Sequence, residues 1–182
     1  MRERVSGPKV IGGRGSRLDG VLSGFVASWL KALSERRLQG VAESLLPATA
    51  GQKEEVGADP SGHPQNMPPA VIIGRLAWVL GHARLTDSQR IRAQGLVHYG
   101  FGAGLGAAYG AAGRRWPTTT RGAGTLAGLA IYAGTHGLVL PALGIQRPPW
   151  RLAPAAVAWE SASHVVFGAA LEGARRLTEA GE

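Results

Sequence analysis

The sequence contains no cysteine, so disulfide bonds and thiolate chemistry are both excluded. It also lacks a nucleophile–histidine–acid pattern, a phosphate-binding loop and a dinucleotide fingerprint. Two long stretches, residues 94–113 and 122–146, contain no charged residue at all. Together these absences argue against a soluble enzyme, and we do not expect an enzymatic role.

The charge that is present is mostly basic and unevenly distributed. The chain has 20 Lys and Arg against 12 Asp and Glu, which gives a net charge of +8. Such a balance fits nucleic acid, an anionic membrane surface, or charges that flank helices. The arginines cluster at the ends of apolar segments, whose interiors are nearly free of charge. This pattern predicts a lipid bilayer as the partner and argues against nucleic acid.

The hydropathy pattern predicts an all-α protein, specifically a polytopic membrane four-helix bundle with an additional interfacial helix. A single transmembrane domain is expected at residues 18–176, between a basic mobile tail at 1–17 and a C-terminal tail at 177–182. The loop expected at residues 36–93 contains an apolar stretch at about 70–84, too short to span comfortably. We interpret that stretch as the interfacial helix, with a re-entrant segment as the alternative. The four spans are expected at residues 18–35, 94–113, 122–146 and 154–173.

Basic residues also predict the orientation. The N-terminal tail, the loop at 114–121 and the tail that begins with Arg175 and Arg176 fall on one side of a four-span protein. The short loop on the other side has only Arg147 and Arg151. Because cytoplasmic loops carry an excess of basic residues, both termini are expected in the cytoplasm.

Glycines recur at intervals that suit close helix packing. They would weaken a soluble helix, but in lipid they let two backbones approach closely. A neighbouring stripe contains Gly100 and Gly104. The residues expected to mediate helix packing are Gly102, Gly106, Gly110, Gly124 and Gly128.

Two sets of residues resemble a known family. The first is Gly24-Phe-Val-Ala-Ser-Trp-Leu-Lys31 followed by Glu35. The second runs from His98 through His136 and Leu140-Pro141 to Glu160, His164 and Arg175-Arg176. On these residues the chain resembles the YagU-type family of bacterial inner-membrane proteins, a family of uncharacterised function. The resemblance implies a multi-pass protein of the bacterial inner (cytoplasmic) membrane and leaves residues 40–93 unassigned.

Five polar residues of the expected spans fall at similar depths. At 1.5 Å per residue, Lys31 lies roughly 10 Å from the face on the side of the long loop. His98 and His136 lie about 6 and 9 Å below that face, and Glu160 and His164 about 9 and 15 Å. The sequence therefore predicts one polar layer near the outer face.

Three interpretations of this layer stay open. The polar residues could simply hold the bundle together, as in a structural subunit of a larger membrane complex or a homo-oligomer. They could handle protons or small ions, the function we favour, with Glu160, His164, His136, His98 and Lys31 as candidates. They could instead bind a metal through His98, His136, His164 and Glu160, or a haem between His98 and His136.

Several charged residues lie within one helical turn of a possible partner on the same helix. Glu160 and His164 lie one helical turn apart and are expected to act as one unit. Lys31 and Glu35 are interpreted as an interfacial pair, since both can reach towards the membrane surface. Glu172 is interpreted as part of a solvated helix end.

Overall fold

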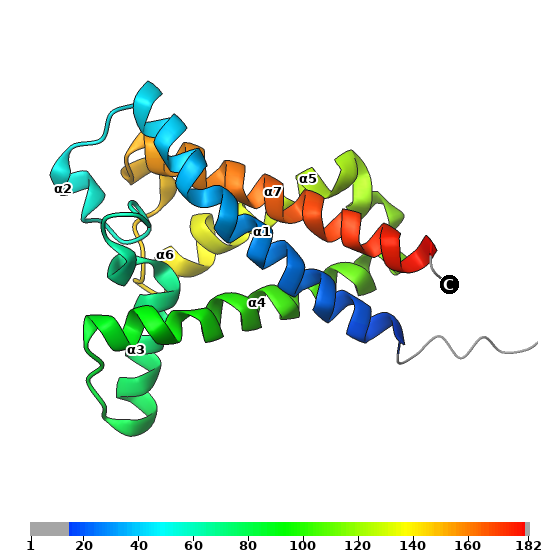
Figure 1. Cartoon of the computed structure of the whole chain (residues 1–182), viewed down its shortest axis with the longest axis horizontal. Helices are drawn as coiled ribbons and strands as arrows, with labels where there is room; N and C mark the ends of the chain where they lie inside the picture. The colour runs from blue at the N-terminus through cyan, green and yellow to red at the C-terminus, as the bar shows by residue number, and fades with distance from the viewer. Residues whose placement is uncertain (1–14, 181–182) are drawn as a thin grey trace, which may run out of the picture.

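Long helices that pack side by side make up most of the molecule. The computed structural model describes residues 15–180 and contains no strand among them, which confirms the all-α prediction. α1 (Gly15–Leu45) packs against α4 (Asp87–Arg115) and α7 (Pro154–Ala180), and α7 packs against α5 (Thr125–Gly134) (Figure 1). Most of the mobile tail expected at 1–17, and the last two residues of the expected C-terminal tail, lie outside the described residues.

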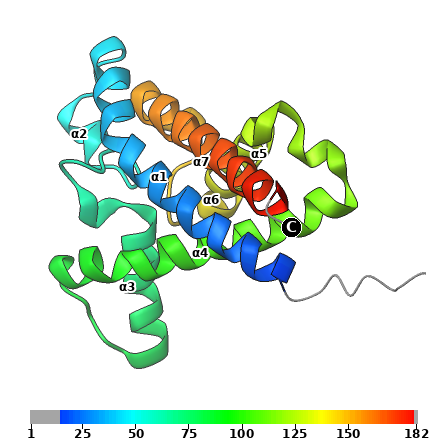
Figure 2. The same cartoon turned by 45° about the vertical axis from the view of Figure 1, so that its right-hand side comes forward.

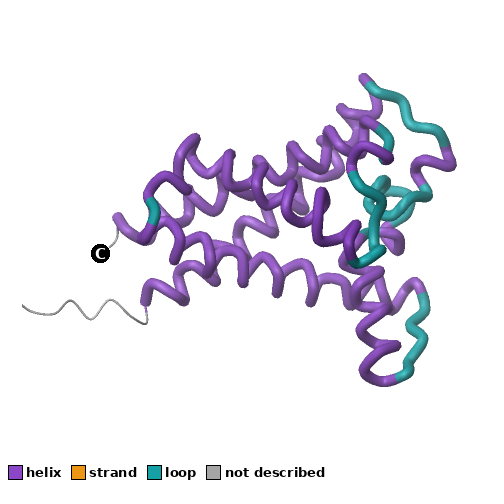
Figure 3. Tube along the Cα trace, turned by 180° about the vertical axis from the view of Figure 1, so that it is seen from behind, coloured by secondary structure: helices purple, strands orange, loops and turns teal. Residues whose placement is uncertain are grey.

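The two ends of the molecule differ. The start of α1 and the end of α7 lie together at one end (Figures 1 and 2). Most loops gather at the opposite end (Figure 3), where the chain also forms several short helices. α3 (Pro68–Gly81) lies there, crosswise to α4 (Figure 1). Three of the short elements are α2 (Ala50–Lys53), η1 (Pro64–Asn66) and η4 (Pro149–Arg151).

The long connection is shorter than predicted. Residues 36–45 continue α1 and residues 87–93 begin α4, although both stretches were assigned to the loop at 36–93. Residues 36–45 contain no proline and several strong helix formers, so nothing ends α1 at the expected place. α4 begins early because Thr86 forms a capping box with Gln89. The predicted interfacial helix at 70–84 corresponds to α3, which ends where His82 adopts a φ of 52°.

The third apolar segment is a composite helix. It runs through η2 (Pro117–Gly124), α5, the π-helical turn η3 (Thr135–Val139) and α6 (Leu140–Ala142). Among the described residues, Pro117–Ala142 is the one helical stretch long and apolar enough to cross a membrane. Only 28 % of its most apolar 18-residue stretch is buried, whereas the core helix of a soluble protein is mostly buried. Its regular part starts at Thr125 because Arg121, Gly122 and Ala123 depart from helical backbone angles.

Many large apolar side chains point outward, while several charged side chains point inward. Soluble proteins seldom bury ionisable groups or expose large contiguous apolar patches. Here the reverse holds, which is typical of helices that contact lipid. The large exposed apolar residues of α1 are Leu18, Leu22, Phe25, Val26, Trp29, Leu30, Leu33, Val41 and Leu45. The buried ionisable residues are Lys31, Asp59, His136, Glu160, His164 and Glu172.

Glycines line two close helix crossings. Where α1 meets α4, a Cβ at Gly106 would lie 2.2 Å from the carbonyl oxygen of Gly20, and one at Gly24 would lie 2.1 Å from that of Gly102. Backbone contact this close leaves no room for a side chain. By contrast, a Cβ at Gly100 or Gly104 would meet nothing within 4 Å, so these two glycines do not mediate a close helix crossing. A Cβ at Gly110 meets only Arg114 and Gly20, at ordinary contact distances.

The second crossing joins α5 to α7. A Cβ at Gly128 would lie 2.1 Å from the carbonyl oxygen of His164, and one at Gly124 would lie 2.1 Å from that of Gly168. Gly124 also has a φ of 82°, a backbone conformation that favours glycine. This crossing brings the backbone of α5 against the turn of α7 that carries His164.

The long loop folds over one end of the bundle, and a hydrogen bond to Asp59 connects it to α1. The carboxylate of Asp59 accepts hydrogen bonds from the side chain of Gln39 (2.7 Å) and the backbone N–H groups of Ser61 (3.1 Å) and Gly62 (2.8 Å). Nδ1 of His63 lies 3.2 Å from its second oxygen. Burial alone would raise the pKa of Asp59, but these hydrogen bonds outweigh it and hold the pKa below its ordinary value.

We expect Gly106→Leu to cost about 3 kcal/mol of stability or prevent folding, because the new side chain would separate α1 from α4. Gly104→Leu is the matched control, since position 104 faces open space on the same helix. Thermal unfolding and the yield of monodisperse protein in detergent measure both variants. Equal stability of the two would contradict this crossing.

We expect acid to loosen the loop through Asp59. A carboxyl whose pKa is lowered by folding stabilises the fold above its unfolded pKa of about 3.9. That contribution is lost as the pH falls through the folded pKa. Asp59→Asn should therefore flatten the fall in melting temperature below about pH 5. Glu54→Gln, at an exposed position of the same loop, should keep the native profile, and identical profiles for all three proteins would refute the role of Asp59.

Candidate functional site

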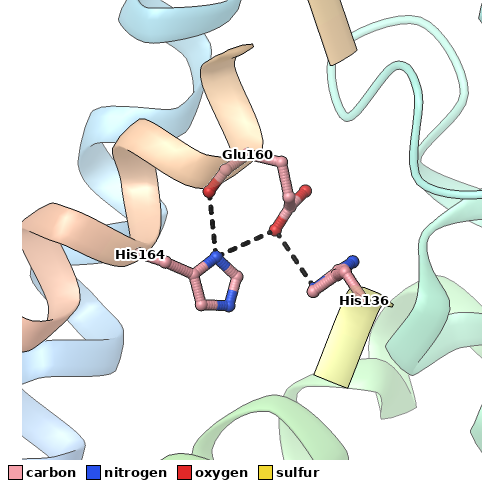
Figure 4. Close-up of side chains that lie close together, drawn as sticks. All are labelled: His136, Glu160 and His164. Carbon is pink, nitrogen blue, oxygen red and sulfur yellow. Dashed lines mark hydrogen bonds and ion pairs between the residues drawn. The ribbon is translucent and has the colours of Figure 1, made fainter. Parts of the chain in front are cut away.

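One carboxylate oxygen on α7 contacts three ionisable side chains. Oε1 of Glu160 lies 3.1 Å from Nζ of Lys31, 3.4 Å from Nε2 of His136 and 3.5 Å from Nδ1 of His164. The residues come from α1, η3 and α7, and Figure 4 shows the two imidazoles on either side of the carboxylate. Glu160 is 4 % exposed, and its other oxygen, Oε2, is buried without a hydrogen-bond partner. Lys31, Glu35, His136, Glu160 and His164 are called the Glu160 cluster below.

Lys31 joins this cluster to a second carboxylate. Its ammonium lies 2.6 Å from Oε1 of Glu35, one turn further along α1. Lys31 was interpreted as half of an interfacial pair, but its side chain is turned inward and is only 8 % exposed overall. With both imidazoles neutral, two carboxylates against one ammonium leave the cluster with one negative charge.

Hydrogen bonds fix the protons of both imidazoles. The Nδ1–H of His164 donates to the backbone carbonyl of Glu160 at 2.9 Å, and the Nδ1–H of His136 donates to Oε1 of Gln146 at 2.8 Å. In a neutral imidazole the other nitrogen then carries a lone pair. Nε2 of His136 is therefore the atom that can accept a proton, and it faces the carboxylate of Glu160.

The π-helical turn presents His136 to the cluster. Thr135–Val139 departs from α-helical hydrogen bonding, and its one buried residue is His136. Pro141 lies just beyond and has no N–H to donate to the carbonyl four residues earlier, which favours this local widening. Single π-helical turns inside α-helices are frequent at functional sites.

Two residues of the site were missed by the sequence reasoning. The hydropathy pattern places Gln146 at the end of a span, yet its side chain is buried and accepts a hydrogen bond from Nδ1 of His136. The ring of Tyr132 lies 5.3 Å from that of His136 and 5.4 Å from that of His164. The spacing of Tyr132, one turn before His136, is the signal that could have revealed it.

The predicted polar layer is only partly assembled into one cluster. Lys31, His136, Glu160 and His164 meet, whereas Nε2 of His98 instead lies 3.2 Å from the carbonyl oxygen of Ser28, one turn before Lys31 on α1. Among the described residues, the group with metal-ligand spacing is His136, Glu160 and His164, whose ligand atoms lie within 4.8 Å of one another. His98 does not belong to this group.

A second polar cluster lies nearer the end where α1 begins and α7 finishes. Glu172 is 1 % exposed and accepts hydrogen bonds from the hydroxyl of Tyr109 (3.0 Å), Nε of Arg175 (2.8 Å) and Nε of Arg176 (2.6 Å). The interpretation of Glu172 as a solvated helix end was therefore wrong. The sequence alone does not reveal that Tyr109 of α4 lies against the carboxylate of Glu172. Apolar residues that include Ala27, Phe167 and Leu171 pack between the two polar clusters.

Residues 41–173 match the family model described as protein of unknown function, DUF1440. The chain belongs to this family. The matched region includes His136, Glu160 and His164, while Lys31 and Glu35 precede it on α1. No curated protein and no solved structure matches the chain.

We expect Lys31→Met to destabilise the protein by about 3–5 kcal/mol, because it leaves the buried carboxylate of Glu160 without its counter-ion. Glu160→Gln should cost less, since Lys31 keeps Glu35 as a partner. The double variant should be more stable than Lys31→Met alone, because no unpaired charge remains at position 160. Unfolding in detergent or nanodiscs measures the three variants. Additive losses would show that the two residues do not interact.

Proposed function

We propose that this protein is a polytopic membrane protein of the bacterial inner membrane that handles protons or small monovalent cations at the Glu160 cluster. The proposal includes four spans, both termini in the cytoplasm, and a YagU-type relationship within its family. α1, α4, the composite helix and α7 would provide the spans. α3 would lie in the interface on the outer side.

The distribution of side chains supports the membrane assignment. α1 has 31 residues and α7 has 27, so at 1.5 Å per residue each is about 40 Å or longer and can cross a bilayer. Within residues 15–180, the composite helix is the one recognised by composition as apolar enough to span. The others contain charges such as Lys31 and Glu160, but these are buried against one another and turned away from lipid.

The charge imbalance of the cluster is the observation that carries the functional proposal. A buried group of charges is stabilised when its net charge is close to zero. With both imidazoles neutral, the Glu160 cluster falls one positive charge short, and its acceptor atoms include the lone pair on Nε2 of His136 and the unpartnered Oε2 of Glu160. One proton or one monovalent cation would neutralise it.

A divalent metal is the second candidate, and one observation favours it. His136, Glu160 and His164 offer two nitrogens and one oxygen within 4.8 Å, a donor set that suits zinc or another transition metal. The ammonium of Lys31 lies on the same carboxylate oxygen and would repel such an ion. Metal analysis of the purified protein distinguishes the two. About one tightly bound ion per chain, lost in His136→Gln, would favour metal binding over ion handling.

Topology is tested by reporter fusions at position 60 and at the C-terminus. The four-span arrangement predicts that these positions report opposite sides of the membrane, because the long loop follows the first span and the C-terminus follows the fourth. A fusion at position 119 should report the same side as the C-terminus. Reports from the same side at position 60 and the C-terminus would exclude four spans.

Ion handling is tested in liposomes loaded with a pH-sensitive dye. The native protein should dissipate an imposed proton gradient, and Glu160→Gln should reduce the rate to that of empty liposomes, because the substitution removes the excess negative charge. Parallel gradients of sodium and potassium identify the ion.

Glu43→Gln provides the control for that experiment. Glu43 also lies on α1 but pairs with Lys53 of the loop outside the cluster. It should keep the native rate. An equal rate for native protein and Glu160→Gln would refute the proposed role of the cluster.

A further inference from the structure

A groove between α3 and the start of α4 lies outside the Glu160 cluster. Its volume is about 630 Å³, and its lining is mostly apolar. α3 and the loop after it contribute Val71, Trp78, Val79 and Leu85 to the lining. Trp78 and Val79 are largely exposed, so this hairpin presents apolar surface to its surroundings.

Three arginines surround this apolar surface. Arg75, Arg84 and Arg90 all line the groove. Arg75 donates to the carbonyl oxygens of Leu143 and Gly144, which ties α3 to the end of the composite helix. The remaining two guanidinium groups are held differently.

Arg84 and Arg90 have unused capacity to bind an anion. The guanidinium of Arg84 lies 5.3 Å from the centre of the Trp78 ring, and no described carboxylate pairs with it. Arg90 pairs with Asp87, but its Nε is buried without a hydrogen-bond partner. Three guanidinium groups against the single carboxylate of Asp87 leave the groove with two excess positive charges. The Arg90 side chain is still 26 % exposed, so an anion in the groove can approach its positive charge.

We propose that this groove binds an anionic phospholipid, with the phosphate on Arg84 and Arg90 and an acyl chain along Val71, Val79 and Leu85. Basic pockets with apolar walls at the membrane surface suit such lipids. Trp78 is the kind of residue that settles at the level of the headgroups. The proposal rests on the membrane location proposed above, because α3 must lie in the interface for a lipid to reach it.

The test uses the full-length protein in neutral detergent and measures bound lipid by native mass spectrometry. Phosphatidylglycerol and phosphatidylcholine with identical acyl chains are the probes. The native protein should bind phosphatidylglycerol more tightly. Two arginines near a lipid headgroup each contribute roughly a factor of five in affinity, so Arg84→Gln/Arg90→Gln should bind it about 25-fold more weakly.

Arg92→Gln/Arg151→Gln is the matched control. It removes the same charge from exposed positions that do not line the groove, so it should keep native affinity. If the groove variant does not fold, Arg84→Gln alone, in the loop, should still show a loss of about fivefold. An equal loss in the control, or equal binding of the two lipids, would overturn the proposal.

Two further measurements separate the possible failures. Inorganic phosphate that displaces phosphatidylglycerol at similar affinity would identify a phosphate site without a lipid and overturn the proposal. The groove variant should also dissipate the proton gradient at the native rate. Loss of lipid binding with normal ion flux supports a separate lipid site. If the native protein does not dissipate the proton gradient, the proposed role of the Glu160 cluster is refuted. The lipid-binding measurement then still tests the groove separately.

Discussion

The ion pair between Lys31 and Glu160 constrains the rest of the molecule. Both groups are almost fully removed from solvent, and a buried charge without a partner would cost several kcal/mol. The pair therefore fixes the depth at which α1 passes α7. It also explains why the cluster includes Glu35, since the ammonium has more than one hydrogen to donate. His136 and His164 complete the site, which is one positive charge short of neutrality when both imidazoles are neutral.

Close backbone packing makes this polar contact possible. Gly124 and Gly128 bring α5 against the turn of α7 that carries His164, and the π-helical turn then directs His136 to the same point. On the other side of α1, Gly102 and Gly106 bring α4 close. Larger side chains at these crossings would separate the helices, while large apolar side chains remain free to cover the outer surface.

Much of this arrangement could be predicted from sequence, because helical rise converts residue number into depth. That reasoning predicts similar depths for Lys31, Glu160, His136 and His164, and the structure brings these four side chains into contact. It could not give rotation about each helix axis, so it grouped His98 with them and left Glu172 in solvent. It also missed Gln146 and the folded loop around Asp59, since contacts between segments with no apolar period leave no local signal. Four membrane spans remain a prediction.

The most direct test of this account is the protonation of His136, measured by nitrogen NMR on histidine-labelled protein in lipid bilayers. The account predicts that acidification adds a proton to Nε2 of His136 while Nδ1 keeps its proton to Gln146. In Glu160→Gln the proton should bind more weakly, because the facing carboxylate is gone. A His136 signal that stays neutral throughout, or that titrates identically in both proteins, would contradict the central role of Glu160.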